Sequence, residues 1–117
     1  MSTYTLTDET AIDVLIFWIE SADGSISFKE LDAVKRVLAT MNYDLSTYNE
    51  TLGHISAMST EHLHEIAKEA RDYIKSNFSD EGQQLTYGLL EAIATSDGKI
   101  TPSEEEKLAT IKAEFGI

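Results

Sequence analysis

Apolar residues follow a helical pattern along most of the chain. Residues 8–22 begin with acidic positions and then become apolar on nearly every side, with an unbroken apolar run at 14–19. A helix that is apolar all round belongs at the centre of a bundle. Apolar residues at about 3.6-residue spacing predict a second helix over 28–41, and a capping box at 47–50 predicts a third over 48–58. Three more begin after Ser59, Ser79 and Thr101, the second of them with an apolar face of Leu85, Leu89, Leu90 and Ile93.

Capping residues mark where these helices begin. A Ser or Thr side chain satisfies a free backbone N–H at a helix start, and such residues precede three of the predicted helices: Thr7, Ser59 and Ser79. Capping boxes, in which a hydroxyl and a carboxylate satisfy each other's backbone donors, occupy residues 27–30, 47–50 and 101–104. Pro102 stands at the first helical position, where its missing N–H costs nothing. About six helices joined by short loops predict an all-α fold, a compact helical bundle.

The chain contains an internal repeat. Residues 12–43 align with residues 86–117 without a gap, and the identical pairs include Leu15/Leu89, Ile19/Ile93, Asp23/Asp97, Gly24/Gly98, Ile26/Ile100 and Glu30/Glu104. Each copy predicts a helix, an Asp-Gly turn and a second helix. We therefore expect two helical hairpins related by approximate two-fold symmetry, with residues 44–84 packed around them, in one domain spanning 1–117.

Composition narrows the classes of protein to which this chain can belong. The 117 residues hold 9 Lys+Arg against 21 Asp+Glu, for a net charge of −12. Such a surface does not favour nucleic acid, because phosphate binding needs clustered cations. The absence of cysteine excludes disulfides and Cys-ligated zinc. The longest apolar run is far shorter than the roughly 20 residues of a membrane span and no signal peptide is evident, so we expect a cytoplasmic protein that does not insert into membranes.

The two Asp-Gly turns have the spacing of the second half of a calcium-binding EF-hand loop. In that loop a final glutamate gives two oxygens to the ion. A full-length loop ending at Glu30 would begin at Ile19, and one ending at Glu104 would begin at Ile93. Because isoleucine cannot bind calcium, a functioning EF-hand is not expected. Both glutamates are also explained without metal, since each completes a capping box.

The same turns resemble a more specific family. The segments A-D-G-S-I-S at 22–27 with Glu30, and S-D-G-K-I-T-P at 96–102 with Glu104, are similar to the paired turns of the tellurite-resistance TerB-like family. The terminal residues 115–117, F-G-I, match the short tail common in that family. The resemblance implies an all-helical bundle, divalent-metal binding by the acidic positions and an intracellular stress-response role.

If the approximate two-fold symmetry holds, the two turns approach each other and gather carboxylates. The candidate metal ligands are Asp23, Asp97, Glu30, Glu104 and Glu20. Hard oxygen ligands of this kind favour Ca²⁺, Mg²⁺ or Mn²⁺. The alternative is that both aspartates bond backbone amides within their own turns, a common role for Asp before Gly.

The sequence offers no catalytic constellation. Glu61 and His64 form one Glu-x-x-His pair, whereas a di-iron site needs two such pairs and two further glutamates. The histidines are expected at the surface: His54, His62 and His64. We therefore expect a non-catalytic TerB-like module that docks a protein partner, with a divalent cation at the twin turns. The alternative is a small metal-dependent enzyme that uses the same carboxylates.

Overall fold

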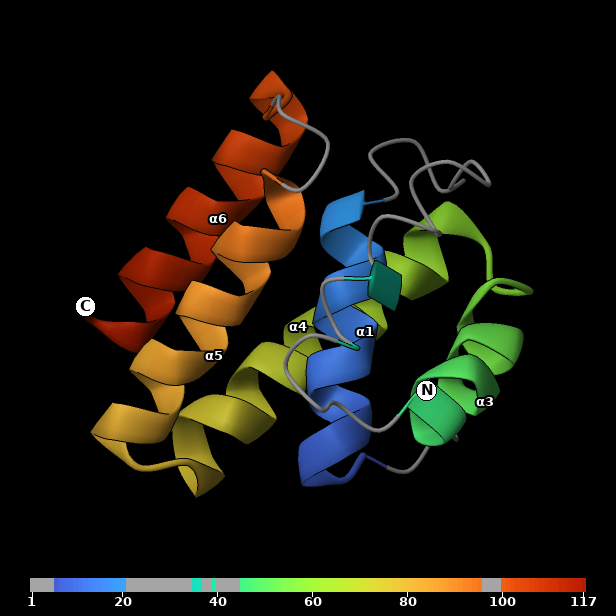
Figure 1. Cartoon of the computed structure of the whole chain (residues 1–117), viewed down its shortest axis with the longest axis horizontal. Helices are drawn as coiled ribbons and strands as arrows, with labels where there is room; N and C mark the ends of the chain where they lie inside the picture. Colours follow the sequence, from blue (N-terminus) through green and yellow to red (C-terminus); the bar gives the residue numbers. More distant parts are fainter. Residues whose placement is uncertain (1–5, 21–34, 37–38, 40–44, 96–99) are drawn as a thin grey trace.

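The computed structural model describes residues 6–20, 35–36, 39, 45–95 and 100–117. Within these ranges it contains five helices and no strand, as the all-α prediction requires (Figure 1). They are α1 (Asp8–Glu20), α3 (Leu45–Ile55), α4 (Thr60–Asn77), α5 (Asp80–Ala94) and α6 (Pro102–Phe115). The helix predicted over 28–41 lies mainly outside the described residues, although Lys35, Arg36 and Ala39 are helical.

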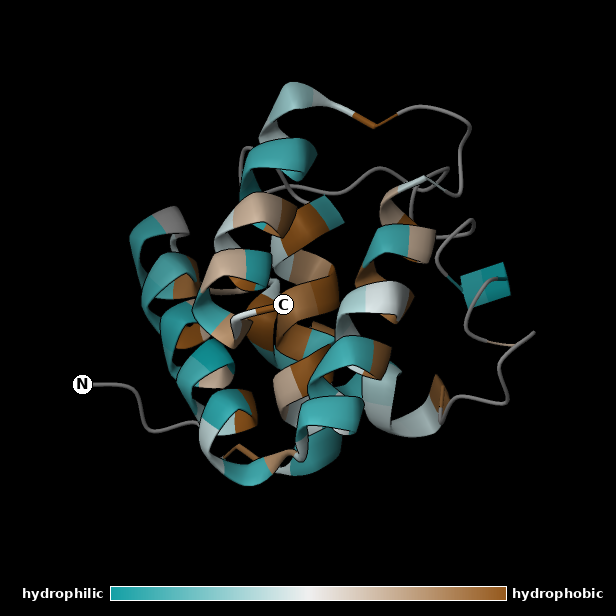
Figure 2. Ribbon diagram, turned by 90° about the vertical axis from the view of Figure 1, so that its left-hand side faces the viewer, coloured by the Kyte–Doolittle hydropathy of each residue, from teal (hydrophilic) through white to brown (hydrophobic). Residues whose placement is uncertain are grey.

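Helix α1 forms the centre of the bundle, as its apolar pattern predicts. It contacts α3, α4, α5 and α6, and in Figure 1 it runs between α3 and the α5–α6 pair with α4 behind it. All but four of its residues are buried, including both charged residues that flank its apolar run, Asp13 and Glu20. Figure 2 shows hydrophobic residues gathered toward the middle of the molecule and hydrophilic residues on the outward helix faces.

Helices α1 and α4 run antiparallel, because each end of α1 is bonded to the opposite end of α4. Near the start of α1, the Tyr73 hydroxyl of α4 donates to Asp8 Oδ1 at 2.9 Å. Near its end, Trp18 Nε1 donates to Nδ1 of His64, in the first half of α4, at 3.1 Å. These two contacts fix the axial position of one helix against the other.

Four of the predicted N-caps are confirmed. The hydroxyls of Thr7, Ser59 and Ser79 each accept a backbone N–H from three residues on, at 3.2, 3.1 and 3.0 Å. At α6 both halves of the capping box are present, with Pro102 inside the first turn. The helix ends at Phe115 and is capped by Gly116, whose φ of 74° lies in the left-handed region that glycine adopts without strain.

The prediction for the start of α3 was wrong. The helix begins at Leu45, so Thr47 lies inside the helix instead of capping it, and the helix ends at Ile55 instead of residue 58. Leu45 is partly buried against the hydrophobic core. Because the helix begins at Leu45, an apolar side chain packs against the core. Local capping patterns contain no information about such packing.

The predicted apolar face of α5 was wrong at Leu85, whose exposed fraction is 69%. The face turned inward is instead formed by Gln83, Thr86, Leu90, Ile93 and Ala94. Its two polar members are buried with hydrogen bonds: Gln83 Nε2 donates to the Phe78 carbonyl at 3.0 Å, and Thr86 Oγ1 donates to the Gly82 carbonyl at 2.8 Å. These hydrogen bonds lower the cost of burying the two polar side chains, although Gln83 Oε1 is buried without a partner among the described residues. Helix α5 is therefore rotated so that Leu85 faces solvent.

None of the helices described is both long and apolar enough to cross a membrane. Helices α5 and α6 contain the helical parts of the second repeat, and they contact each other. Because both Asp-Gly segments lie outside the described residues, the approximate two-fold relation stays a prediction.

Candidate functional site

The structure describes two of the five candidate metal ligands. Glu20 and Glu104 are both buried, each 5% exposed. Asp23, Glu30 and Asp97 lie outside the described residues. Among the residues that are described, no group of three or more His, Asp or Glu side chains is placed to hold a metal ion.

Glu104 has a structural role in the capping box of α6. Its Oε1 accepts the backbone N–H of Thr101 at 2.8 Å, and the Thr101 hydroxyl accepts the backbone N–H of Glu104 at 3.1 Å. These bonds satisfy backbone donors that the helix start would otherwise leave free. The box therefore accounts for the burial of this carboxylate without any ligand.

A second group of polar residues surrounds Trp18, near the end of α1. The indole is 6% exposed, and its Nε1–H donates to His64 Nδ1. The Arg71 guanidinium carbon lies 4.6 Å from the centroid of the indole ring, and Lys107 Nζ lies 5.2 Å from it. Lys107 Nζ also donates to the Trp18 carbonyl at 2.7 Å. Helices α4 and α6 are thus both anchored to one residue of α1.

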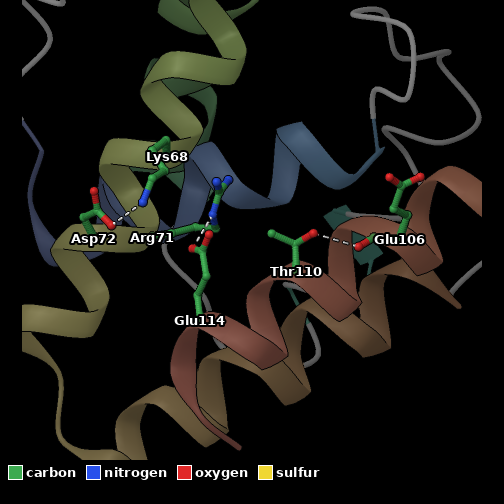
Figure 3. Close-up of polar contacts among 6 residues, drawn as sticks. All are labelled: Lys68, Arg71, Asp72, Glu106, Thr110 and Glu114. Carbon is green, nitrogen blue, oxygen red and sulfur yellow. Dashed lines mark hydrogen bonds and ion pairs between the residues drawn. The ribbon is translucent and has the colours of Figure 1, made fainter.

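The Arg71 cation at this anchor is buried and paired. Its Nε donates to Glu114 Oε1 at 2.7 Å, which joins α4 to α6 (Figure 3). Arg71 is 7% exposed, so this pair is more shielded from solvent than the exposed Lys68–Asp72 pair, also drawn in Figure 3. An exposed pair within one helix stabilises it by only about 0.5 kcal/mol. The bond from Arg71 to Glu114 therefore joins α4 to α6, as does the bond from Lys75 Nζ to the Phe115 carbonyl at 3.1 Å, whereas the Lys68 pair lies within α4.

An open groove of about 890 Å³ runs along the outer face of α4. It is lined by Glu61, His64, Glu65, Lys68 and Glu69. The three glutamates follow one another at four-residue intervals and so share one face of the helix. In the part of the chain that the structure describes, none of their carboxylates has a hydrogen-bond or ion-pair partner, whereas Lys68 is bonded to Asp72 at 2.9 Å. Among the described residues that line it, the groove, referred to below as the α4 groove, is thus mainly acidic.

A buried polar cluster lies between α1 and α3. Asp13 is fully buried, and its Oδ2 accepts the hydroxyl of Thr51 at 3.1 Å. Tyr48 is also fully buried. Burial, and then the negative charges of Asp13 and Glu20, raise the pKa of the Tyr48 hydroxyl far above its usual range. A phenol held neutral in this way cannot serve as a general base at neutral pH, so the cluster has the properties of a structural site.

Two residues described above were not among those predicted for a functional site: His64 and Asp13. His64 was expected at the surface, and its side chain is exposed, yet it is also bonded to the indole. The sequence indicates this contact only weakly. It contains a single Trp, and His64 directly follows Leu63, which lies in the core. Asp13 could have been found, because a carboxylate within the most apolar helix needs a polar partner in the core.

The fold and these sites define a small all-α domain built around a buried central helix, with an acidic groove on its surface. The chain belongs to the TerB family: the model of that family, described as tellurite resistance protein TerB, matches residues 9–117. No curated protein and no solved structure matches the chain in the corresponding searches. Membership bears out the resemblance of the paired Asp-Gly turns and gives a tellurite-resistance-like context.

Proposed function

We propose that the chain is a non-catalytic interaction module of tellurite resistance and that it docks a protein partner in the α4 groove. The observation that carries the proposal is the row of three glutamates, Glu61, Glu65 and Glu69, whose carboxylates have no partner among the described residues. Carboxylates aligned along an open groove are positioned to contact another molecule. The fold and the family context support this role.

The charge of the groove supports a basic protein segment as the partner. Successive glutamates on this face have Cβ atoms about 6 Å apart, a spacing that Lys or Arg side chains of an extended or helical segment can match. The net charge of −12 adds a long-range attraction for such a segment. The partner is therefore a protein that presents several cations in a row.

The test removes the three charges without changing side-chain shape. We expect the Glu61→Gln/Glu65→Gln/Glu69→Gln variant to lose tellurite tolerance in cells that depend on this gene. A photo-crosslinker placed at Lys68 should join a partner to the parent protein and not to this variant. The matched control, Asp80→Asn/Glu81→Gln/Glu91→Gln, removes three charges from exposed positions on α5 and should retain both properties. Full tolerance in the groove variant, with circular dichroism showing intact helices, would contradict the proposal.

A divalent cation at the twin turns is the second part of the proposed function. It is supported by the repeated Asp23 and Asp97 of the sequence. Isothermal titration of metal-free protein with Ca²⁺, Mg²⁺ and Mn²⁺ should give heat of binding, which Asp23→Ala/Asp97→Ala abolishes. Glu104→Gln should keep most of the affinity, because the Glu104 carboxylate already accepts the Thr101 N–H. Absence of heat together with an unchanged melting temperature for all three ions would exclude the cation and leave the docking role intact.

A further inference from the structure

The contact between His64 and Trp18 joins the α4 groove to the core of the bundle. His64 lines the groove, and its Nδ1 accepts the Nε1–H of Trp18 at 3.1 Å. Trp18 is 6% exposed and also receives Lys107 on its backbone carbonyl. We infer that this pair is a proton-operated latch: neutral His64 holds the end of α1 against α4, and protonation of His64 releases it. The inference goes beyond the proposed function and does not depend on any partner.

The hydrogen-bonding groups of the two side chains determine how the latch works. An indole N–H can only donate. His64 must therefore present a lone pair on Nδ1, so in the closed state its imidazole is neutral and carries its hydrogen on Nε2. Protonation places a second hydrogen on Nδ1, after which two donors face each other. The hydrogen bond is lost, and the buried indole N–H is left without this acceptor.

Charged groups surround the contact on the helices packed around it. They are Glu61, Glu65, Lys68 and Arg71 on α4, and Lys107 and Glu114 on α6. Arg71 and Lys107 lie against the indole, and Arg71 is paired with Glu114. Among these groups, histidine is the one type whose ordinary titration falls between about pH 5 and 8.

Release of the latch affects both sides of the contact. On the core side, the last turns of α1 lose a bond to α4 and keep the bond from Lys107. On the groove side, His64 gains a positive charge beside the carboxylates of Glu61 and Glu65. Mild acid therefore changes the charge of the groove at the same time as it loosens α1.

The indole N–H of Trp18 provides a direct measurement, because the chain contains a single Trp and gives one indole resonance. The resonance is followed by ¹H–¹⁵N correlation spectroscopy as pH falls from about 8 to about 5, the histidine range. We expect a sigmoidal change in its chemical shift and faster exchange with water at the acid end. Tryptophan fluorescence should change with the same midpoint, while circular dichroism stays helical.

Three variants distinguish the latch from a general effect of acid. His64→Gln keeps an acceptor that does not titrate and should make the resonance independent of pH. His64→Ala removes the acceptor and should resemble the acid state at every pH. His54→Gln serves as the matched histidine control and should behave like the parent protein. An unchanged resonance in the parent protein, or the same transition in His64→Gln, would overturn the inference without touching the proposed docking role.

Discussion

At the scale of single residues, Tyr48 is completely buried although it carries a polar hydroxyl. Its side chain is fully buried between α1 and α3. Among the described residues, no hydrogen-bond partner faces its hydroxyl. Burial, and then the charges of Asp13 and Glu20, raise the pKa of the phenol. A buried hydroxyl without a partner costs free energy that a phenyl ring of the same shape does not.

Tyr48→Phe should therefore be neutral or raise the free energy of unfolding by about 1 kcal/mol, as measured by urea denaturation at neutral pH. The variant should also resist alkali better than the parent protein. A phenol whose pKa is raised by folding stabilises the native state fully below the unfolded pKa, near 10, and loses that contribution as pH rises toward the folded pKa. Equal losses of stability above about pH 10 in both proteins would contradict the assignment.

At the scale of helices, sequence reasoning succeeded where the physics is local. N-caps and the capping box at Thr101 depend on side chains three residues apart, and they were predicted correctly. The start of α3 and the rotation of α5 depend on which neighbour each helix packs against. The contact of Trp18 with His64 joins residues 46 positions apart, so neither spacing nor propensity could indicate it. The predicted metal site remains a prediction, because three of its residues lie outside the described ranges.

The rotation of α5 can be tested with two leucines of the same helix. Leu90 is fully buried and Leu85 is 69% exposed. Leu90→Ala should lower the free energy of unfolding by about 2–5 kcal/mol, because it leaves a cavity in the core. Leu85→Ala should change it by no more than about 0.5 kcal/mol. Thermal denaturation of both variants provides the comparison, and similar losses in the two would show that the rotation is wrong.

At the scale of the whole molecule, charge is present inside as well as outside. The buried residues include the acids Asp13, Glu20 and Glu104 and the bases Arg71 and Lys107. The buried bases bond to a carboxylate or a backbone carbonyl and lie against Trp18. The exposed glutamates of the α4 groove have no such partner among the described residues. The composition alone gave only the net charge, whereas the structure separates charges that are bonded inside the bundle from charges that are exposed and have no partner among the described residues.

The bond from Lys107 to the Trp18 carbonyl spans 89 positions of the chain. The ribosome therefore makes the most apolar helix long before it makes the helix that helps to cover it. At synthesis rates of about 5–20 residues per second, that delay is on the order of ten seconds. During this interval α1 can be shielded from solvent only in part, and the nascent chain exposes a hydrophobic segment. Translation, more than the finished fold, is the stage at which this chain is most exposed to aggregation.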